Sequence, residues 1–331
     1  MTLDARLLRI LRAAEVHASA GEMAAELGVP CATIEAALVR LGDAGFDIEG
    51  RPGLGWRLLG SPDRLVADDL HARLGPCAIA REILVFEETS STNDVATRLG
   101  RDGHAGGVAI FAERQTAGRG RFGRQWDSQV GAGLWFSLLL RPPWPAAHWV
   151  RLTTWAGVAV AGAIEQAIGR TAKIKWPNDV LIDGRKIAGI LTECSTDSSG
   201  KMFAVVGIGV NVNQEEFPAE IADRAASLRQ LASRKIDRAD LAAALLGELD
   251  SRLSKVESAF PHLIEEAARR RAILGEWVRL HAGGEPVEGT AESLDADGHL
   301  LLRTADGALR TMSFGEVTSH PPAPVPEPGQ F

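Results

Sequence analysis

The first sixty residues place apolar side chains at the spacing of helices and then of a hairpin. The apolar residues at the start recur three and four positions apart: Leu3, Leu7, Leu8 and Leu11. This pattern predicts helices at residues 3–15, 22–27 and 32–44, and a β-hairpin at residues 46–59. The tight turn Gly28-Val29-Pro30 separates the second and third helices. Residues 1–62 are therefore predicted to form a winged helix-turn-helix.

The middle of the chain mixes strand and helix patterns. Residues 63–80 follow Ser61-Pro62 and are predicted to be a linker, and residues 81–270 are predicted to be one large domain. Strands are expected at residues 83–86, 107–112, 134–140, 171–176, 180–182, 189–193 and 204–213. Helices are expected at residues 93–99, 149–168 and 238–260.

The pattern changes again near the C-terminus. From residue 276 short apolar runs alternate with turn pairs such as Asp297-Gly298, which predicts a small all-β domain over residues 271–320. Residues 321–331 are rich in proline and are predicted to be a disordered tail. The whole chain is thus predicted to be an α+β (α/β) protein of several domains.

Composition excludes several classes of protein. Hydrophobic residues make up 45% of the 331 residues and charged residues 24%, as in ordinary globular proteins. The net charge of −7 gives no bulk attraction to nucleic acid or anionic lipid. Three scattered cysteines, Cys31, Cys77 and Cys194, suggest neither a zinc site nor a disulfide framework. With no signal peptide or long apolar span, we expect a cytoplasmic protein that does not enter a membrane.

The strongest chemical signal is the run Gly118-Arg119-Gly120-Arg121-Phe122-Gly123-Arg124, followed by Gln125-Trp126. Glycines let a backbone approach a ligand closely, and arginines donate forked hydrogen bonds to phosphate or carboxylate oxygens. No Gly-Lys-Ser/Thr follows, so the run is not a Walker A loop. A flexible basic surface loop is the alternative interpretation.

A second signal combines Lys175-Trp176-Pro177-Asn178-Asp179 with Lys186 at the start of the next strand. Two cations and a carboxylate at one end of a hairpin suit a phosphate group, a magnesium ion or a nucleophile's proton. The alternative is a charged hairpin tip in solvent, since hairpin tips are usually polar.

Two further segments are weaker signals. Ser90-Ser91-Thr92-Asn93 precedes a predicted helix, where the residues suit an N-cap or a ligand-binding helix terminus. Residues 207–213, Gly-Ile-Gly-Val-Asn-Val-Asn, suit a strand with one crowded, ligand-facing side or a closely packed core strand.

Taken in order, these segments resemble the biotin protein ligases of the bifunctional ligase/repressor type. The resemblance rests on Ser91–Asn93, Gln115–Trp126, Lys175–Asp179, Lys186–Ile190 and Gly207–Asn211. It implies a mixed-sheet catalytic domain like that of class II synthetases, a C-terminal SH3-like β-barrel, and a homodimer. It also implies that ATP, with Mg²⁺, converts biotin to biotinyl-5′-AMP, and that the biotin then passes to a lysine of a biotin carboxyl carrier protein.

The resemblance assigns roles residue by residue. The residues implied to hold biotin are Ser91, Thr92, Asn93, Gln115, Arg119, Gly120, Arg121 and Lys186. Those expected at ATP and the adenylate are Arg121, Arg124, Trp126, Lys175, Asn178 and Asn211. Catalysis is expected from Arg121, Lys175, Asp179 and Lys186, with Asp179 also a Mg²⁺ ligand. All of this depends on Arg121 and Lys186 meeting in one cavity.

DNA binding by the N-terminal segment is a separate question. Residues 1–60 carry six arginines and no lysine against eight acidic residues, an unfavourable balance for phosphate contacts. Thr33, Arg40 and Arg51 are the DNA-contact candidates, with operator DNA as the expected partner. Two alternatives stay open beside a ligase: an adenylate-sensing repressor with little ligase activity, and a lipoate ligase.

Overall fold

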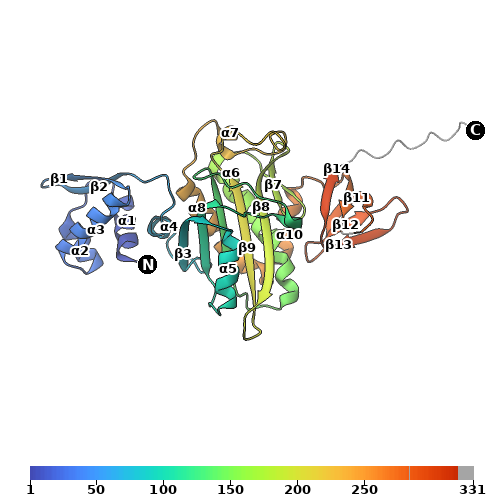
Figure 1. Cartoon of the computed structure of the whole chain (residues 1–331), viewed down its shortest axis with the longest axis horizontal. Coiled ribbons are helices and arrows are strands. Elements are labelled where there is room, and N and C mark those ends of the chain that lie inside the picture. The colour runs from blue at the N-terminus through green and yellow to red at the C-terminus, as the bar shows by residue number, and fades with distance from the viewer. Residues whose placement is uncertain (283, 320–331) are drawn as a thin grey trace, which may run out of the picture.

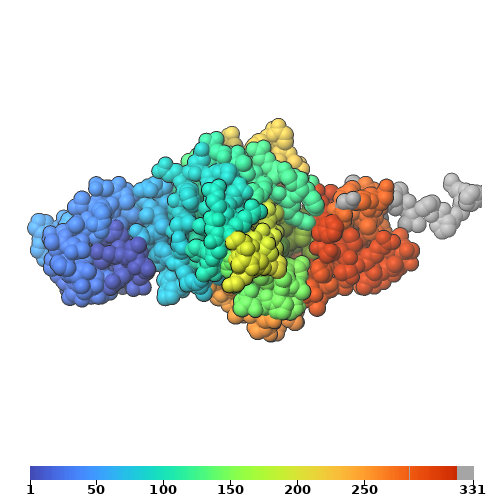
Figure 2. Space-filling model, turned by 60° about the horizontal axis from the view of Figure 1, so that its bottom comes forward, coloured from blue at the N-terminus to red at the C-terminus, as the bar shows by residue number. Residues whose placement is uncertain are grey.

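The computed structural model describes residues 1–282 and 284–319. The predicted disordered tail, residues 321–331, lies outside the described residues. The chain forms three successive masses: an N-terminal helical part, a large central part and a C-terminal all-β part (Figures 1 and 2). No helix among the described residues is both long and apolar enough to cross a membrane.

The N-terminal part contains three helices and a two-stranded antiparallel hairpin. The elements are α1 (Leu3–Ala13), α2 (Ala20–Leu27), α3 (Cys31–Asp43), β1 (Asp47–Arg51) and β2 (Gly55–Gly60). A capping box between Ser19 and Glu22 starts α2, and Gly28, with a left-handed φ of 68°, ends it. These local signals explain why the sequence pattern located the helices, which pack on one apolar core of their own.

The segment predicted to be a linker, residues 63–80, contains a helix, α4 (Ala67–Leu74). This helix packs against α1 on one side and against α8 (Arg238–Leu253) on the other. Its buried Asp69 forms ion pairs with Arg12 of α1 and Arg73 of α4. The segment therefore joins the first two parts of the molecule through packed contacts.

The central part is built on a seven-stranded mixed sheet with the order β3-β4-β5-β9-β8-β7-β6. Its strands are β3 (Glu82–Thr89), β4 (Val108–Gln115), β5 (Gly133–Leu140), β6 (Lys173–Lys175), β7 (Asp179–Ile182), β8 (Arg185–Thr196) and β9 (Met202–Asn211). Only β3 and β4 run parallel; every other neighbouring pair is antiparallel. The seven strands expected from the sequence are present, with shifted ends.

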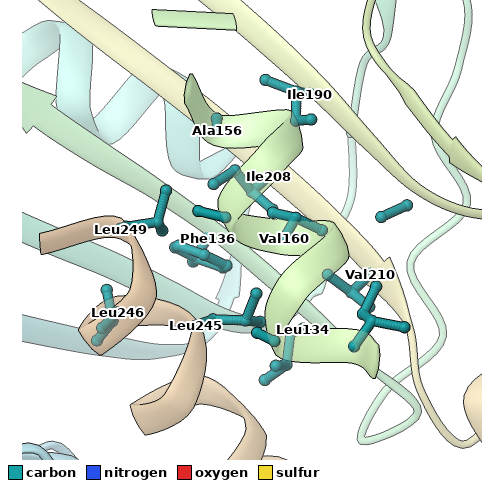
Figure 3. Close-up of a cluster of buried hydrophobic side chains, with 14 of the residues drawn as sticks. Leu134, Phe136, Ala156, Val160, Ile190, Ile208, Val210, Leu245, Leu246 and Leu249 are labelled. Carbon is teal, nitrogen blue, oxygen red and sulfur yellow. The ribbon is translucent and has the colours of Figure 1, made fainter. Parts of the chain in front are cut away.

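Helices cover both faces of this sheet. Helix α5 (Thr92–Arg101) lies on one face, while α6 (Arg151–Ile168) and α8 lie on the other (Figure 1). The remaining helices are α7 (Leu228–Ala232), α9 (Lys255–Ser258), α10 (Phe260–Arg269) and the short 3₁₀ turns η1 (Arg121–Gly123) and η2 (Ala146–Val150). The core between the sheet and α6 and α8 is built mainly from apolar side chains (Figure 3). Its members include Leu134, Phe136, Ala156, Val160, Ile190, Ile208, Val210, Leu245, Leu246 and Leu249.

The single long helix predicted at residues 238–260 is wrong. The structure ends α8 at Leu253, inserts the short α9, and begins α10 at Phe260. Pro261 lies in the first turn of α10, where its missing N–H costs nothing; inside a continuous helix it would clash and remove a hydrogen bond. The sequence pattern did not predict this break between α8 and α10.

The C-terminal part is a five-stranded antiparallel sheet with the order β13-β12-β11-β10-β14. Its strands are β10 (Trp277–His281), β11 (Val287–Leu294), β12 (Leu300–Arg303), β13 (Leu309–Met312) and β14 (Glu316–Ser319). Its small core also takes in Trp176 from the central part. The Trp176 indole N–H donates to the Gly298 carbonyl at 3.0 Å, which fixes this sheet beside the turn that follows β6.

Candidate active site

One cavity of about 180 Å³ gathers nearly all the residues that the sequence singled out. It opens above the carboxyl-terminal part of β9, on the face of the sheet that carries α5. The predicted residues that line it are Ser91, Thr92, Asn93, Gln115, Arg119, Gly120, Arg121, Arg124, Trp126, Lys175, Asn178, Asp179 and Lys186. The expectation that Arg121 and Lys186 share one cavity is confirmed.

Glycines form the floor of the cavity. Gly189 of β8 lies directly opposite Gly209 of β9. Gly207 precedes Gly209 by two residues in β9 and therefore lies on the same face of the sheet. A Cβ atom at Gly209 would lie 2.7 Å from the Trp126 ring, and one at Gly207 would lie 2.2 Å from Asn93 Oδ1. Gly207 and Gly209 therefore leave room for a ligand on one side of β9, while Ile208 between them packs into the apolar core on the other side.

The polar end of the cavity is a connected hydrogen-bond network. The Thr92 N–H donates to Gln115 Oε1 at 2.8 Å, and Gln115 Nε2 donates to Ser128 Oγ at 3.3 Å. The Ser137 hydroxyl lies 2.7 Å from Thr92 Oγ1 and 2.5 Å from Asn93 Oδ1. Ser137 is fully buried in the otherwise apolar β5, which marks it as a supporting residue that the sequence analysis missed.

Arg119 is held by two carboxylates. Its guanidinium lies 2.5 Å from Asp94 Oδ1 and 3.2 Å from Glu193 Oε2, so it ties the glycine–arginine loop to α5 and β8. Burial opposes it, but these contacts raise the pKa of Arg119. Sequence reasoning missed Glu193, because it lies outside the motifs and reaches the loop only through the fold.

Arg121 is placed differently from the other arginines of the loop. Its guanidinium donates to the Gly315 carbonyl at 3.0 Å and to Asn178 Oδ1 at 3.4 Å. No carboxylate of the described residues forms an ion pair with it. Burial lowers the pKa of Arg121, but a guanidinium stays charged at neutral pH. Arg121 is thus a half-buried cation whose charge is available to an anionic ligand.

The second cation is Lys186, which lies in β8 and lines the same cavity as Arg121. Its Nζ lies 2.6 Å from Asp179 Oδ1 and 5.2 Å from the centre of a Trp126 ring. Asp179 starts β7 and Lys186 lies near the start of β8, so the hairpin brings them together across the strand pair. A carboxylate next to an ammonium group is well placed to orient that group or to exchange a proton with an incoming amine.

The turn before β7, residues 176–178, forms another wall of the cavity. The Asn178 amide donates to the Ile190 carbonyl at 2.9 Å, while its Oδ1 accepts from Arg121. The Trp176–Pro177 peptide bond in this turn is cis. Lys175 also lines the cavity and, like Arg121, forms no ion pair with a described residue. The turn therefore positions Arg121 and adds a second available positive charge.

The C-terminal part contributes to the wall, which the sequence analysis did not anticipate. Gly315, Glu316 and Val317 line the cavity, and Arg124 forms an ion pair with Glu316. That contact lowers the pKa of Glu316. A second cavity of about 190 Å³ also borders Arg121 and Asn178, so the space around the Arg121 guanidinium extends beyond the first cavity.

Asn211, expected at the adenylate, is the exception among the site residues. It is buried and does not line the cavity. Its amide donates to the Ala226 carbonyl at 3.2 Å and to the Lys186 carbonyl at 3.4 Å. The side chain is occupied in holding the backbone of Lys186 and the segment before α7, since both of its polar atoms find partners within the chain.

The DNA-contact candidates lie apart from this cavity. Arg40, near the end of α3, forms an ion pair with Asp4 at 2.6 Å, and Arg51 of β1 forms one with Glu49 at 3.0 Å. Thr33 lies in the first turn of α3 and is half-buried. Both arginines thus already have a carboxylate partner within the N-terminal part.

The residues that the structure describes include no cluster of three or more acidic, histidine or cysteine side chains suited to a metal ion. Asp179 is the one predicted metal ligand. A single carboxylate beside a phosphate site fits Mg²⁺, which is usually held by one or two carboxylates together with substrate phosphates.

Two family models match the chain. Residues 85–213 match the Biotin/lipoate A/B protein ligase family, and residues 273–318 match the Biotin protein ligase C terminal domain. A Bacillus subtilis protein named Bifunctional ligase/repressor BirA is 36% identical over 272 residues, which cover 81% of this chain and 84% of that protein. A Mycobacterium tuberculosis biotin–[acetyl-CoA-carboxylase] ligase is 36% identical over 243 residues, covering 72% and 88%.

The fold agrees with these relatives. A solved structure of a biotin protein ligase from Aquifex aeolicus, in complex with biotin and ATP, superimposes with a TM-score of 0.63 at 32% identity. The match covers 72% of this chain and 98% of that one. The mixed central sheet, the antiparallel C-terminal sheet and the two matched family models agree with one another. The chain belongs to the biotin protein ligase family.

Proposed function

We propose that the protein activates biotin with ATP and transfers the biotinyl group to a lysine of a biotin carboxyl carrier protein. The observation that carries the proposal is the meeting of Arg121, Lys175 and Lys186 in one cavity with the polar network of Thr92, Asn93 and Gln115. The three cations suit the biotin carboxylate and the α-phosphate of ATP, which must approach each other. The polar network suits the ureido head group of biotin. Carboxylase-linked relatives support the choice of acceptor.

In the first step an oxygen of the biotin carboxylate attacks the α-phosphorus of ATP. The bond from that phosphorus to the bridging oxygen breaks, pyrophosphate leaves, and biotinyl-5′-AMP remains. Two negatively charged groups must approach each other, so cations fixed in advance lower the barrier. Arg121, the half-buried cation without a carboxylate partner, is assigned to the α-phosphate, and Lys186 to the biotin carboxylate. Trp126 and Arg124 are assigned to the rest of the adenylate.

In the second step the neutral amine of the acceptor lysine attacks the carbonyl carbon of the mixed anhydride. An amide bond forms and AMP leaves, while the amine gives up a proton. We assign Asp179 to orient this amine or to accept the proton, because its carboxylate faces the cavity beside Lys186. Mg²⁺, held by the ATP phosphates and Asp179, would supply charge neutralisation to the triphosphate.

Pyrophosphate release tests the ligase proposal. The protein is mixed with ATP and Mg²⁺ and with either biotin or lipoate, since lipoate ligases share the larger family model. Biotin-dependent pyrophosphate, followed by transfer of radiolabelled biotin to a purified carrier domain, is the expected result. Pyrophosphate release with lipoate but not with biotin would show that lipoate, and not biotin, is the substrate. Adenylate formation without any transfer would favour the adenylate-sensing regulator.

A regulatory role is the second candidate. Three helices followed by a hairpin suit a winged helix-turn-helix, and a relative is named a ligase/repressor. The negative balance of residues 1–60, and the internal pairing of Arg40 and Arg51, weaken phosphate contacts. We therefore propose that biotin ligation is the main activity and that any binding to operator DNA requires a homodimer. A gel shift with the upstream DNA of its own operon, with and without biotinyl-5′-AMP, decides this question.

The remaining assignments are also proposals. We assign the central part, residues 81–270, to the catalytic fold of class II synthetases and the C-terminal sheet to an SH3-like barrel. We place the activity in the cytoplasm, where ATP and carboxylases are available.

A further inference from the structure

Glu193 of β8 lies just behind the wall of the cavity and contacts two residues of that wall. Its Oε2 accepts a hydrogen bond from Asn93 Nδ2 at 2.5 Å and lies 3.2 Å from Arg119 Nη2. Glu193 itself does not line the cavity. It therefore reaches a bound ligand only through Asn93 and Arg119.

An ionised carboxylate only accepts hydrogen bonds, and this fixes the direction of its neighbours' bonds. The Asn93 amide must turn its NH₂ group to Glu193, so its Oδ1 points to the Ser137 hydroxyl, 2.5 Å away. The Ser137 hydroxyl lies between Asn93 Oδ1, 2.5 Å away, and Thr92 Oγ1, 2.7 Å away, and Thr92 Oγ1 in turn donates to Gln115 Oε1 at 3.1 Å. Glu193 thus fixes which end of the Asn93 amide meets the buried Ser137 hydroxyl.

Biotin makes such an orientation matter. Its ureido head carries one carbonyl acceptor and two N–H donors, and a cavity recognises it only if donors and acceptors stand in the matching places. An asparagine amide can flip, and the flipped form exchanges its donor for its acceptor. Glu193 removes the flipped form of Asn93, because that form would turn Oδ1 towards a carboxylate.

The same carboxylate restrains the glycine–arginine loop. Arg119 stands between Asp94 and Glu193, so its charge is already balanced by two acidic groups. Arg119 is then an anchor of the loop, and the charge for the ligand's anions comes from Arg121 and the lysines of the cavity. Loss of Glu193 would loosen the loop at the residue next to Gly120.

From this geometry we propose that Glu193 is a positioning residue for biotin, which sets the hydrogen-bond direction of Asn93 and anchors Arg119. The proposal rests on the proposed function, since it concerns the substrate of that same cavity. The proposal predicts different effects on the two substrates, because Glu193 contacts the polar network and forms no hydrogen bond or ion pair with Arg121 or Lys175.

The variant Glu193→Gln tests the proposal, because it keeps the shape and removes the charge. We expect the Kd and KM for biotin to rise about ten- to a hundredfold, because the variant loses a charge-assisted hydrogen bond. The kcat and the KM for ATP should stay within about threefold, as for a residue that supports ground-state binding of one substrate. Biotin binding is measured by calorimetry, and the rate by pyrophosphate release at varied biotin and ATP.

Three further variants sharpen the test. Glu193→Asp keeps the charge and should recover part of the affinity for biotin. Glu88→Gln is the matched control, since Glu88 of β3 forms an exposed pair with Arg114 at 3.1 Å, away from the cavity. In an Asn93→Ala background the Glu193→Gln change should have a smaller effect on biotin, because the two residues act through one bond.

Two results would overturn the proposal. One is an unchanged Kd for biotin in Glu193→Gln. The other is an equal loss for biotin and ATP together with a lower melting temperature, which would make Glu193 a general structural residue. A wild-type protein that neither binds biotin nor releases pyrophosphate with it would instead refute the ligase function, and the role of Glu193 with it.

Discussion

Arg121 shows how much the function depends on which charges are left unpaired. Among the cations that line the cavity, Lys186 is paired with Asp179, Arg124 with Glu316, and Arg119 with two carboxylates. Arg121 instead donates to a carbonyl and an amide oxygen, both neutral. A charge held by neutral partners in a half-buried position interacts strongly with an incoming anion, because less water screens it.

Replacing Arg121 with alanine should therefore slow adenylate formation by about a hundredfold or more, the effect typical of losing one preorganised charge at a reacting group. Pyrophosphate release at saturating biotin and ATP measures the change. Arg114→Ala is the control, because Arg114 pairs with Glu88 on the exposed surface of the sheet. A loss of only a fewfold in Arg121→Ala would remove Arg121 from the catalytic role.

The cavity floor offers a second test at this scale. Gly207→Ala places a methyl group 2.2 Å from Asn93 Oδ1, so Asn93 must move and the affinity for biotin should fall about tenfold or more. Gly42→Ala is the matched control: a Cβ at Gly42 of α3 has no neighbour within 4 Å. It should leave biotin binding unchanged and stabilise the helix by about 0.5–1 kcal/mol. Calorimetry with biotin and thermal unfolding give the two readouts.

Among the elements, hairpins bring distant chemistry together. The β7–β8 hairpin places Asp179 and Lys186 side by side, and the β8–β9 hairpin places Gly189 opposite Gly209. The turn of the second hairpin is closed by Asp197, whose Oδ1 accepts from the N–H groups of Ser199 and Lys201. Register in both hairpins therefore determines which side chains reach the cavity.

The Asp197 turn predicts a dependence on pH. Hydrogen bonds from Ser199 lower the pKa of Asp197 to about 2, below the value of about 3.9 in an unfolded chain. A lowered carboxyl pKa stabilises the fold above pH ~4, and the stabilisation is lost as the pH falls towards 2. The melting temperature of Asp197→Asn should thus be lower than that of the wild type at pH 7, and the difference should shrink in acid. A difference that stays constant from pH 7 to pH 3 would contradict this origin.

The whole molecule is held together by the segment between its first two parts. The Leu65 N–H donates to Glu113 Oε1 at 2.7 Å, and the buried Arg238 of α8 pairs with the other oxygen of Glu113 at 2.8 Å. One helix turn later, Asp69 pairs with Arg12 of α1 and with Arg73. The N-terminal part is thereby attached to α8 and the sheet through α4.

Asp69→Ala should loosen this attachment. The change leaves Arg12 without its carboxylate partner, while Arg73 keeps the more exposed Asp237 and Asp240, so the loss should be at most about 3 kcal/mol. We expect faster proteolysis between residues 60 and 66 and a lower melting temperature, with biotin-dependent pyrophosphate release nearly unchanged. Lys235→Ala is the control, since Lys235 forms an exposed pair with Asp63 nearby. Unchanged proteolysis in Asp69→Ala would show that packing of α4 alone holds the two parts together.

Local features of the sequence were sufficient to locate much of the fold. Apolar spacing, turn glycines and alternating strands act within a few residues, so α2 and the strand of Gly207 and Gly209 were predicted from the chain, although the start of α2 was placed two residues late. The prediction failed at residues 254–260, where the helical pattern was extended over a break and Pro261 requires a new helix start.

The motif residues of the site can be identified from the chain alone, because each motif combines a backbone requirement with a charged or polar group that has a fixed chemistry. Their supporting contacts, in contrast, arise from the fold. Glu193, Glu316 and Asp69 meet their partners from positions far away along the chain, and Asn211 turns to the backbone behind Lys186. Contacts of this kind depend on strand register and on the packing of α4 and the C-terminal sheet, which no short stretch of sequence encodes.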